Sequence, residues 1–157
     1  LRVRASDDVF GSDGIPLTVK HEALYLGGKV SCSGGATAEI SRRLGEGRRS
    51  FHSLATVWKH ANITRQRKAQ IFEACVVSKV VYGLESLWLL KDQLRKLDAF
   101  SCSCLRQMAG GSPSFFPRVL KEQELDRMHA TPLSQTLHRR QLMLHGRLVR
   151  QPEDEFA

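Results

Sequence analysis

The residues best suited to chemistry in this sequence are arginines and lysines clustered between positions 42 and 68. Guanidinium and ammonium groups at this density neutralise and hydrogen-bond phosphates, so the pattern predicts a surface that binds a nucleic-acid backbone. The candidate phosphate contacts are Arg42, Arg43, Arg48, Arg49, Arg65, Arg67 and Lys68. The alternative is a solvated basic surface that binds nothing in particular.

The chain as a whole has the same charge bias. Its 157 residues carry a formal net charge of +8, and its pI is near 9.7, which indicates a polyanionic partner. We expect nucleic acid rather than membrane, because the longest apolar run, at 84–90, is far shorter than the roughly 20 residues of a spanning helix. The chain opens on charged residues without an initiator methionine, so we expect an intracellular fragment without a signal peptide.

Residues that would support other chemistry are scattered. Asp7 and Asp8 could form a metal-binding pair, but they lead into a turn-rich stretch in which aspartate is common for backbone reasons. Cys102 and Cys104 are one residue apart, whereas zinc ligands usually follow a Cys-x-x-Cys spacing. The sequence contains no phosphate-binding loop, dinucleotide-binding glycine fingerprint or metalloprotease motif. It therefore predicts no catalytic residue, no metal and no cofactor in this chain.

Two helices joined by a tight turn are expected to position the basic residues. The apolar residues of the first recur at steps of three and four and share one face: Ile40, Leu44, Phe51, Leu54 and Trp58. Thr37 is its expected cap, and Thr64 is the expected cap of the second helix, after a turn at 62–64. That helix should end at Gly83 and hold Cys75 as a small core residue. The pair predicts a helical hairpin with an apolar inside and one basic surface.

Short strands are expected before this hairpin. Alternating or apolar residues predict strands at 1–6, 17–19 and 24–30. Gly27 and Gly28 would weaken the last of these strands, which indicates a bulge or a close approach of another backbone. The sequence therefore predicts a mainly α fold with a small N-terminal β element.

Two further helices are expected after the hairpin. One should run from about Asp92 to Gly110, and the other should begin after Thr131 as cap and Pro132 as the first helical residue. Phe115 and Phe116 lie in a loop between them and could fill the core or stack on bases. The last helix combines a leucine stripe with a second basic surface, made of His138, Arg139, Arg140, Arg147 and Arg150.

Four short motifs follow one another along the chain. They are Tyr25-Leu26-Gly27-Gly28, Tyr82-Gly83-Leu84-Glu85, Leu97-Asp98-Ala99-Phe100 followed by Cys104-Leu105-Arg106, and Arg139-Arg140-Gln141-Leu142 with Gly146 beyond it. In order and approximate spacing they resemble the C-terminal part of the reverse transcriptase of non-LTR (LINE-type) retrotransposons. The ordered set of motifs is fairly specific.

This resemblance implies a division of the chain. Residues 1–35 would be the C-terminal end of the palm, with Tyr25, Leu26 and Gly27 in a primer-grip-like hairpin. Residues 36–90 would be the helical thumb, which grips the template–primer duplex, and residues 91–157 a helical connecting segment. The family's metal-binding aspartate pair would lie upstream of this sequence. The resemblance thus implies part of an RNA-directed DNA polymerase that is inactive alone.

The resemblance also implies partners. These would be the RNA template, the DNA primer and the upstream palm and fingers of the same polypeptide, in a nuclear or cytoplasmic ribonucleoprotein. The intact polymerase would use Mg²⁺. Two alternatives are a non-functional retroelement remnant and a helical protein-interaction module that docks through residues 133–148. Binding by such a module should depend on the leucine stripe and respond little to salt.

Overall fold

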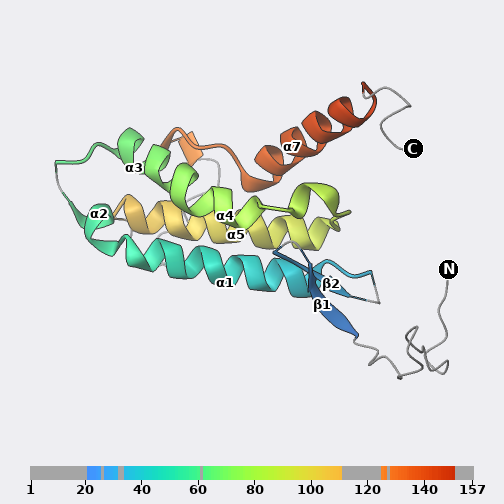
Figure 1. The fold of residues 1–157 in the computed structure, drawn as a ribbon. Helices are drawn as coiled ribbons and strands as arrows, with labels where there is room; N and C mark the ends of the chain where they lie inside the picture. Colours follow the sequence, from blue (N-terminus) through green and yellow to red (C-terminus); the bar gives the residue numbers. More distant parts are fainter. Residues whose placement is uncertain are drawn as a thin grey trace, which may run out of the picture. The chain divides into compact units, whose positions relative to one another are not determined.

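The structure is a computed structural model that describes residues 21–25, 27–31, 34–60, 62–110, 125–126 and 128–150. The chain divides into two compact units, Leu1–Gly35 and Ala36–Ala157. Helices dominate the second unit, and the first contains a two-stranded antiparallel sheet, so the expected fold class is confirmed (Figure 1). The assignment of the units to a palm and a thumb stays a prediction.

The described part of the N-terminal unit is a β-hairpin. Strands β1 (Glu22–Tyr25) and β2 (Gly28–Ser31) pair antiparallel, with Tyr25 opposite Gly28. Gly27 has a φ of 75°, a left-handed conformation that glycine adopts without strain and that suits a tight hairpin turn. The prediction of one strand over 24–30 is therefore wrong, because the chain reverses within it. The expected strands at 1–6 and 17–19 and the loop residues Phe115 and Phe116 lie outside the described residues.

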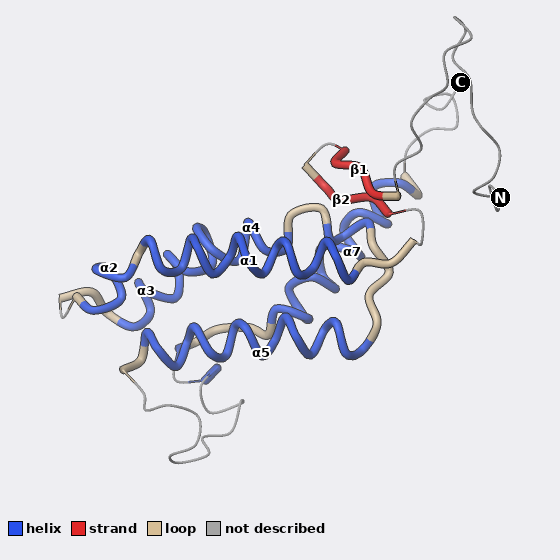
Figure 2. The backbone as a smooth tube through the Cα atoms, turned by 90° about the horizontal axis from the view of Figure 1, so that it is seen from below, coloured by secondary structure: helices blue, strands red, loops and turns tan. Residues whose placement is uncertain are grey.

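The second unit is a bundle of helices. Its elements are α1 (Thr37–Ser53), α2 (Ala55–Lys59), α3 (Arg65–Phe72), the π-helical turn η1 (Glu73–Val77), α4 (Ser78–Val81), the 3₁₀ turn η2 (Leu84–Ser86), α5 (Lys91–Met108) and α7 (Leu133–Leu148). Helix α1 packs against η1 and α4 and also against α5, while α7 contacts α5 and η2. This arrangement can be followed in Figures 1 and 2. Residues 36–90 and 91–157 thus share one packed unit.

The predicted apolar face of the first helix is confirmed. Ile40, Leu44, Phe51 and Trp58 are buried, and Leu54 is half-buried at the break between α1 and α2. The expected cap is wrong. Ala36 occupies the N-cap position without a side-chain hydrogen bond, and the Thr37 hydroxyl instead accepts a 3.1 Å hydrogen bond from Gln93 Nε2 of α5. Thr37 therefore ties α1 to α5.

Gly47 lies where α1 comes closest to its neighbours. A Cβ atom there would overlap Val80 Cγ2 of α4 and lie 3.1 Å from Phe100 Cζ of α5. The absence of a side chain at this position lets three helices meet in the core. Gly45, one half-turn earlier, has open space around it.

The second predicted helix begins as expected and then changes register. Thr64 Oγ1 accepts a 3.2 Å hydrogen bond from the Arg67 amide, which confirms the cap. The extra residue of the π-helical turn rotates the next part of the helix, so the buried positions after Phe72 are Val76, Val77, Val80, Val81 and Leu84. Cys75 is exposed, so its assignment to the core is wrong. Gly83, with φ of 75°, ends the helix as predicted.

The third predicted helix is confirmed as α5, and Gly110 beyond its end has a φ of 73°. The start of α7 differs from the prediction. Pro132 is the N-cap, and Thr131 makes no capping bond. The carboxylate of Asp98, on α5, instead accepts hydrogen bonds from the backbone N–H and the hydroxyl of Ser134, both at 2.9 Å. A side chain from another helix thus satisfies the first turn of α7.

Candidate nucleic-acid interface

A cluster of three aromatic rings joins the end of α1 to α2 and α3. Trp58 stacks on Phe51 with ring centroids 5.3 Å apart, and Phe72 meets Phe51 edge-on at 6.2 Å. The Trp58 indole N–H donates a 2.7 Å hydrogen bond to the Phe51 carbonyl. This aromatic cluster fixes the corner of the bundle at which the candidate phosphate contacts were expected.

Lys68 belongs to this corner as a structural residue. Its side chain is buried, and Nζ donates a 2.6 Å hydrogen bond to the Trp58 carbonyl. That bond satisfies a carbonyl at the end of the short helix α2 and holds α2 against α3. The interpretation of Lys68 as a surface cation is therefore wrong.

Arg42 and Arg43 form an ion-pair network with two glutamates of the same helix. Arg43 Nε lies 2.7 Å from Glu39 Oε1, and Arg42 Nη1 lies 2.6 Å from Glu46 Oε1. The Arg43 and Glu39 side chains are 6% and 3% exposed, and the Arg43 guanidinium lies 4.8 Å above the centre of the Tyr82 ring. The Glu39 hydrogen bond raises the pKa of Arg42 further above its ordinary value. Arg43 is thus an interior residue, and Arg42 is half-buried in the same network.

The other four candidates are exposed. Arg48 and Arg49 lie in the later turns of α1, while Arg65 and Arg67 lie in the first turn of α3. The Arg48 guanidinium is 5.9 Å above the Phe100 ring, and Arg67 Nη1 donates a 3.0 Å hydrogen bond to Gln70 Oε1. We call Arg48, Arg49, Arg65 and Arg67 the corner arginines. Figure 1 shows the end of α1, α2 and the start of α3 at the same end of the bundle.

Acidic side chains are missing from this stretch of sequence. Residues 47–72 contain no aspartate or glutamate, while Glu46 and Glu73 flank them. The cations at the start of α3 oppose the positive end of the helix dipole, so they are not placed there to stabilise the helix.

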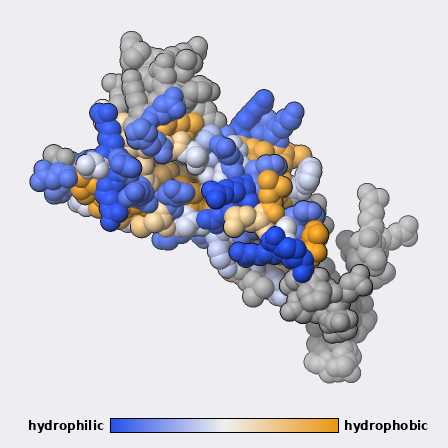
Figure 3. Space-filling model, turned by 90° about the horizontal axis from the view of Figure 1, so that it is seen from above, coloured by the Kyte–Doolittle hydropathy of each residue, from blue (hydrophilic) through white to orange (hydrophobic). Residues whose placement is uncertain are grey.

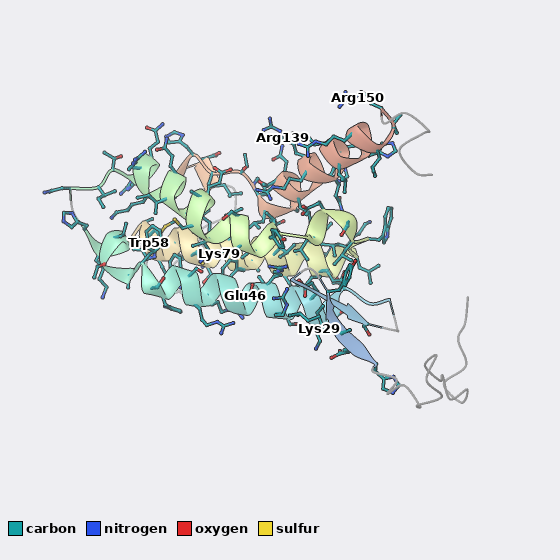
Figure 4. All side chains as sticks on the ribbon, in the orientation of Figure 1. Lys29, Glu46, Trp58, Lys79, Arg139 and Arg150 are labelled. Carbon is teal, nitrogen blue, oxygen red and sulfur yellow. The ribbon has the colours of Figure 1, made fainter. Side chains whose placement is uncertain are left out.

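Two exposed lysines of the same region were not among the candidates. Lys59 lies at the end of α2, and Lys79 Nζ of α4 donates a 2.9 Å hydrogen bond to Ser50 Oγ of α1 (Figure 4). Lys59 could have been included from the sequence, because it directly follows Trp58 at the end of the first predicted helix. The second depends on the packing of α4 on α1, which no local pattern reveals.

The primer-grip-like residues lie in the N-terminal unit. Tyr25 is exposed at the end of β1, Gly27 forms the turn, and Leu26 lies outside the described residues. These residues and the corner arginines therefore belong to different units of the chain.

The cysteines do not form a site in the described part of the chain. Cys102 and Cys104 are buried, and desolvation raises the pKa of the Cys104 thiol to about 12 despite the nearby Arg48 charge. Among the described residues, no group of three histidine, cysteine, aspartate or glutamate side chains is arranged to hold a metal ion. None of the described helices is both long and apolar enough to cross a membrane.

No protein-family model, curated protein or solved structure matches this chain.

Proposed function

We propose that this chain is the C-terminal part of a non-LTR retrotransposon reverse transcriptase, and that its helical unit holds the template–primer duplex through phosphate contacts. The observation that carries the proposal is the group of corner arginines, exposed on two helices that the aromatic cluster joins. The choice of family rests on the four sequence motifs that resemble non-LTR reverse transcriptases. A hairpin of β1 and β2 at the Tyr25-Leu26-Gly27 motif is compatible with a primer grip.

A clamp of this kind acts through position and charge. Contacts to phosphate orient a protein on a duplex and carry no sequence information, which suits a polymerase that must hold every sequence it copies. The rigid corner supports this role, since cations on a fixed scaffold lose less conformational entropy on binding than cations on a loop. The chain would contribute no catalytic group. Mg²⁺ and the metal-binding aspartates would belong to the upstream part of the same polypeptide, in a nuclear or cytoplasmic ribonucleoprotein.

The test is binding of the purified chain to a short RNA–DNA hybrid duplex, before and after charge removal. The test variant is R49Q/R65Q/R67Q, which leaves Arg48 in place because its guanidinium packs over Phe100. The matched control is K91Q/R95Q/K96Q, which removes the same charge from exposed cations of α5. The two variants have equal net charge, so a non-specific charge effect would weaken them alike.

We expect the corner variant to bind about 10-fold or more weakly than the parent chain at 100 mM salt, with equal losses on unrelated duplex sequences. The α5 control should lose about threefold at most. Equal binding by the two variants would contradict the assignment of the interface to this corner. Circular dichroism checks that each variant remains helical.

A further inference from the structure

The outer side of α7 carries apolar side chains that the bundle does not cover. Leu133 and Leu137 at the start of the helix are fully buried. Leu142, Met143, Leu148 and Val149, towards its end, are 61%, 52%, 50% and 69% exposed. The leucine stripe of the sequence, Leu133, Leu137, Leu144 and Leu148, is therefore fully buried only in its first half, since Leu144 is half-buried and Leu148 is exposed. Together with Leu142, Met143 and Val149, the second half of the helix presents apolar surface to solvent.

These apolar side chains are interleaved with cations. Residues 133–150 contain four arginines and two histidines and no acidic residue. Leu142 and Val149 are seven residues apart and so lie on one side of the helix, and Arg139, Met143 and Arg150 follow one another along the adjacent side. Figure 3, which views the unit from the side on which α7 lies, shows strongly hydrophilic and hydrophobic residues next to one another there.

Two grooves lie along α7. One, of about 430 Å³, is lined by His138, Arg139 and Leu142 of α7 and by Glu73 of η1. The other, of about 310 Å³, is lined by Arg140, Met143 and Arg147 together with Glu85 of η2. Each groove thus combines an apolar side chain of α7 with at least one arginine and one glutamate, so the excess of positive charge lies on α7 itself.

Phosphate neutralisation alone would leave the apolar residues unexplained, because a nucleic-acid backbone offers them no apolar partner. A second copy of this chain is also a poor fit, since it would bring two acid-free basic helices together at a net charge of +8 each. An amphipathic helix with carboxylates beside an apolar face satisfies both features, because its apolar side chains enter the grooves and its carboxylates meet the arginines.

We propose that the exposed half of α7 docks an acidic amphipathic helix of a partner protein, with Leu142 and Val149 as apolar anchors and Arg139 and Arg150 as the charged rim. This inference uses residues other than the corner arginines and is independent of the proposed duplex clamp.

The probe is a fluorescein-labelled 18-residue peptide with leucines along one helical face and glutamates elsewhere. A twin peptide with lysine in place of every glutamate is the first control. Two protein variants test the two halves of the surface: L142S/V149S removes the anchors, and R139E/R150E reverses the rim. Their matched controls are L24S/L90S, which removes two exposed apolar side chains outside α7, and R95E/K96E, which reverses exposed charges on α5.

Fluorescence anisotropy should show binding of the acidic peptide with a Kd on the order of 10 μM and no binding of the lysine twin. Each α7 variant should weaken binding about 10-fold or more, while the controls stay within about twofold. Absence of peptide binding, or equal binding of both peptides, would overturn the proposal. So would an R139E/R150E variant that keeps its peptide affinity but loses affinity for an RNA–DNA hybrid or for phosphatidylserine vesicles, because α7 would then serve a nucleic acid or a membrane.

Discussion

The carboxylate of Asp98 caps helix α7 through a residue 36 positions further along the chain: it accepts hydrogen bonds from the amide and the hydroxyl of Ser134, both at 2.9 Å. Asp98 is buried on α5, and its negative charge lies at the positive end of the α7 dipole. The pair therefore sets where α7 starts and how it sits on the bundle. Leu133 and Leu137, next to this contact, are fully buried.

Replacing Asp98 should release α7. We expect D98A to lower the free energy of unfolding by about 1–3 kcal/mol, because the first-turn amide of α7 loses its acceptor in a buried place. S134A keeps the backbone bond and should cost less than half as much. Urea unfolding followed by circular dichroism measures both. Equal losses in the two variants would show that the hydroxyl contact, rather than the cap, stabilises the junction.

Two glycines of α1 should respond in opposite directions to the same change. G47A should destabilise the bundle by about 1–3 kcal/mol, because the new methyl group overlaps Val80 and crowds Phe100. G45A adds a methyl group in open space and should stabilise the helix by up to about 1 kcal/mol. Thermal unfolding of the two variants side by side is the measurement. A G47A variant as stable as G45A would contradict the close packing of α1 at this position.

Replacements of Lys68 and of its neighbour Arg67 should have opposite effects: one should lower the stability of the chain, and the other should weaken its binding to the duplex. K68M leaves the Trp58 carbonyl without its 2.6 Å donor, so we expect a loss of about 1–3 kcal/mol in unfolding free energy. The folded variant should still bind an RNA–DNA hybrid within about twofold of the parent chain. R67Q should show the reverse pattern, with unchanged stability and weaker binding. A K68M variant that is as stable as the parent and binds weakly would show that Lys68 contacts the duplex and does not stabilise the bundle.

The buried thiol of Cys104 should make stability depend on pH at the alkaline end. Its pKa is about 12 in the folded chain against an ordinary value of 9.0, so only the unfolded thiol loses its proton between these values. The contribution of this pKa difference to the free energy of unfolding is fully present below pH 9 and is lost as the pH rises towards 12. C104A should remove this part of the pH dependence, which urea titrations at pH 8 and pH 10 can measure. An unchanged difference between the two pH values in C104A would assign the effect to another group.

Local patterns predicted the helices that depend on their own residues. The apolar steps of α1, the Thr64 cap, the span of α5 and the glycine ends of two helices were all predictable from neighbouring positions. Local patterns did not predict features that depend on residues far away in the sequence. The cap of α7 comes from Asp98 on another helix, and the π-helical turn, which places Cys75 outside, has no recognisable signature in the residues around it.

The same limit applies to the candidate site. Charge clustering identified a stretch of chain that carries four exposed arginines, but it could not tell an exposed arginine from an interior one. Arg43 and Arg48 lie only five positions apart on the same helix, but their surroundings differ. Glu39 and Tyr82 enclose Arg43, whereas Arg48 is exposed above the Phe100 ring. Burial of Lys68 required knowledge that the carbonyl of Trp58 ends a short helix beside it.

The most direct test of the duplex clamp is the salt dependence of RNA–DNA hybrid binding by the parent chain and by the R49Q/R65Q/R67Q variant, from about 50 to 200 mM salt. We expect the logarithm of the parent's affinity to fall linearly with the logarithm of salt concentration, whatever the duplex sequence. The slope should become shallower by about one unit for each phosphate-binding arginine that the variant replaces. The same slope and affinity in the two folded proteins would contradict the claim that the corner arginines hold the duplex.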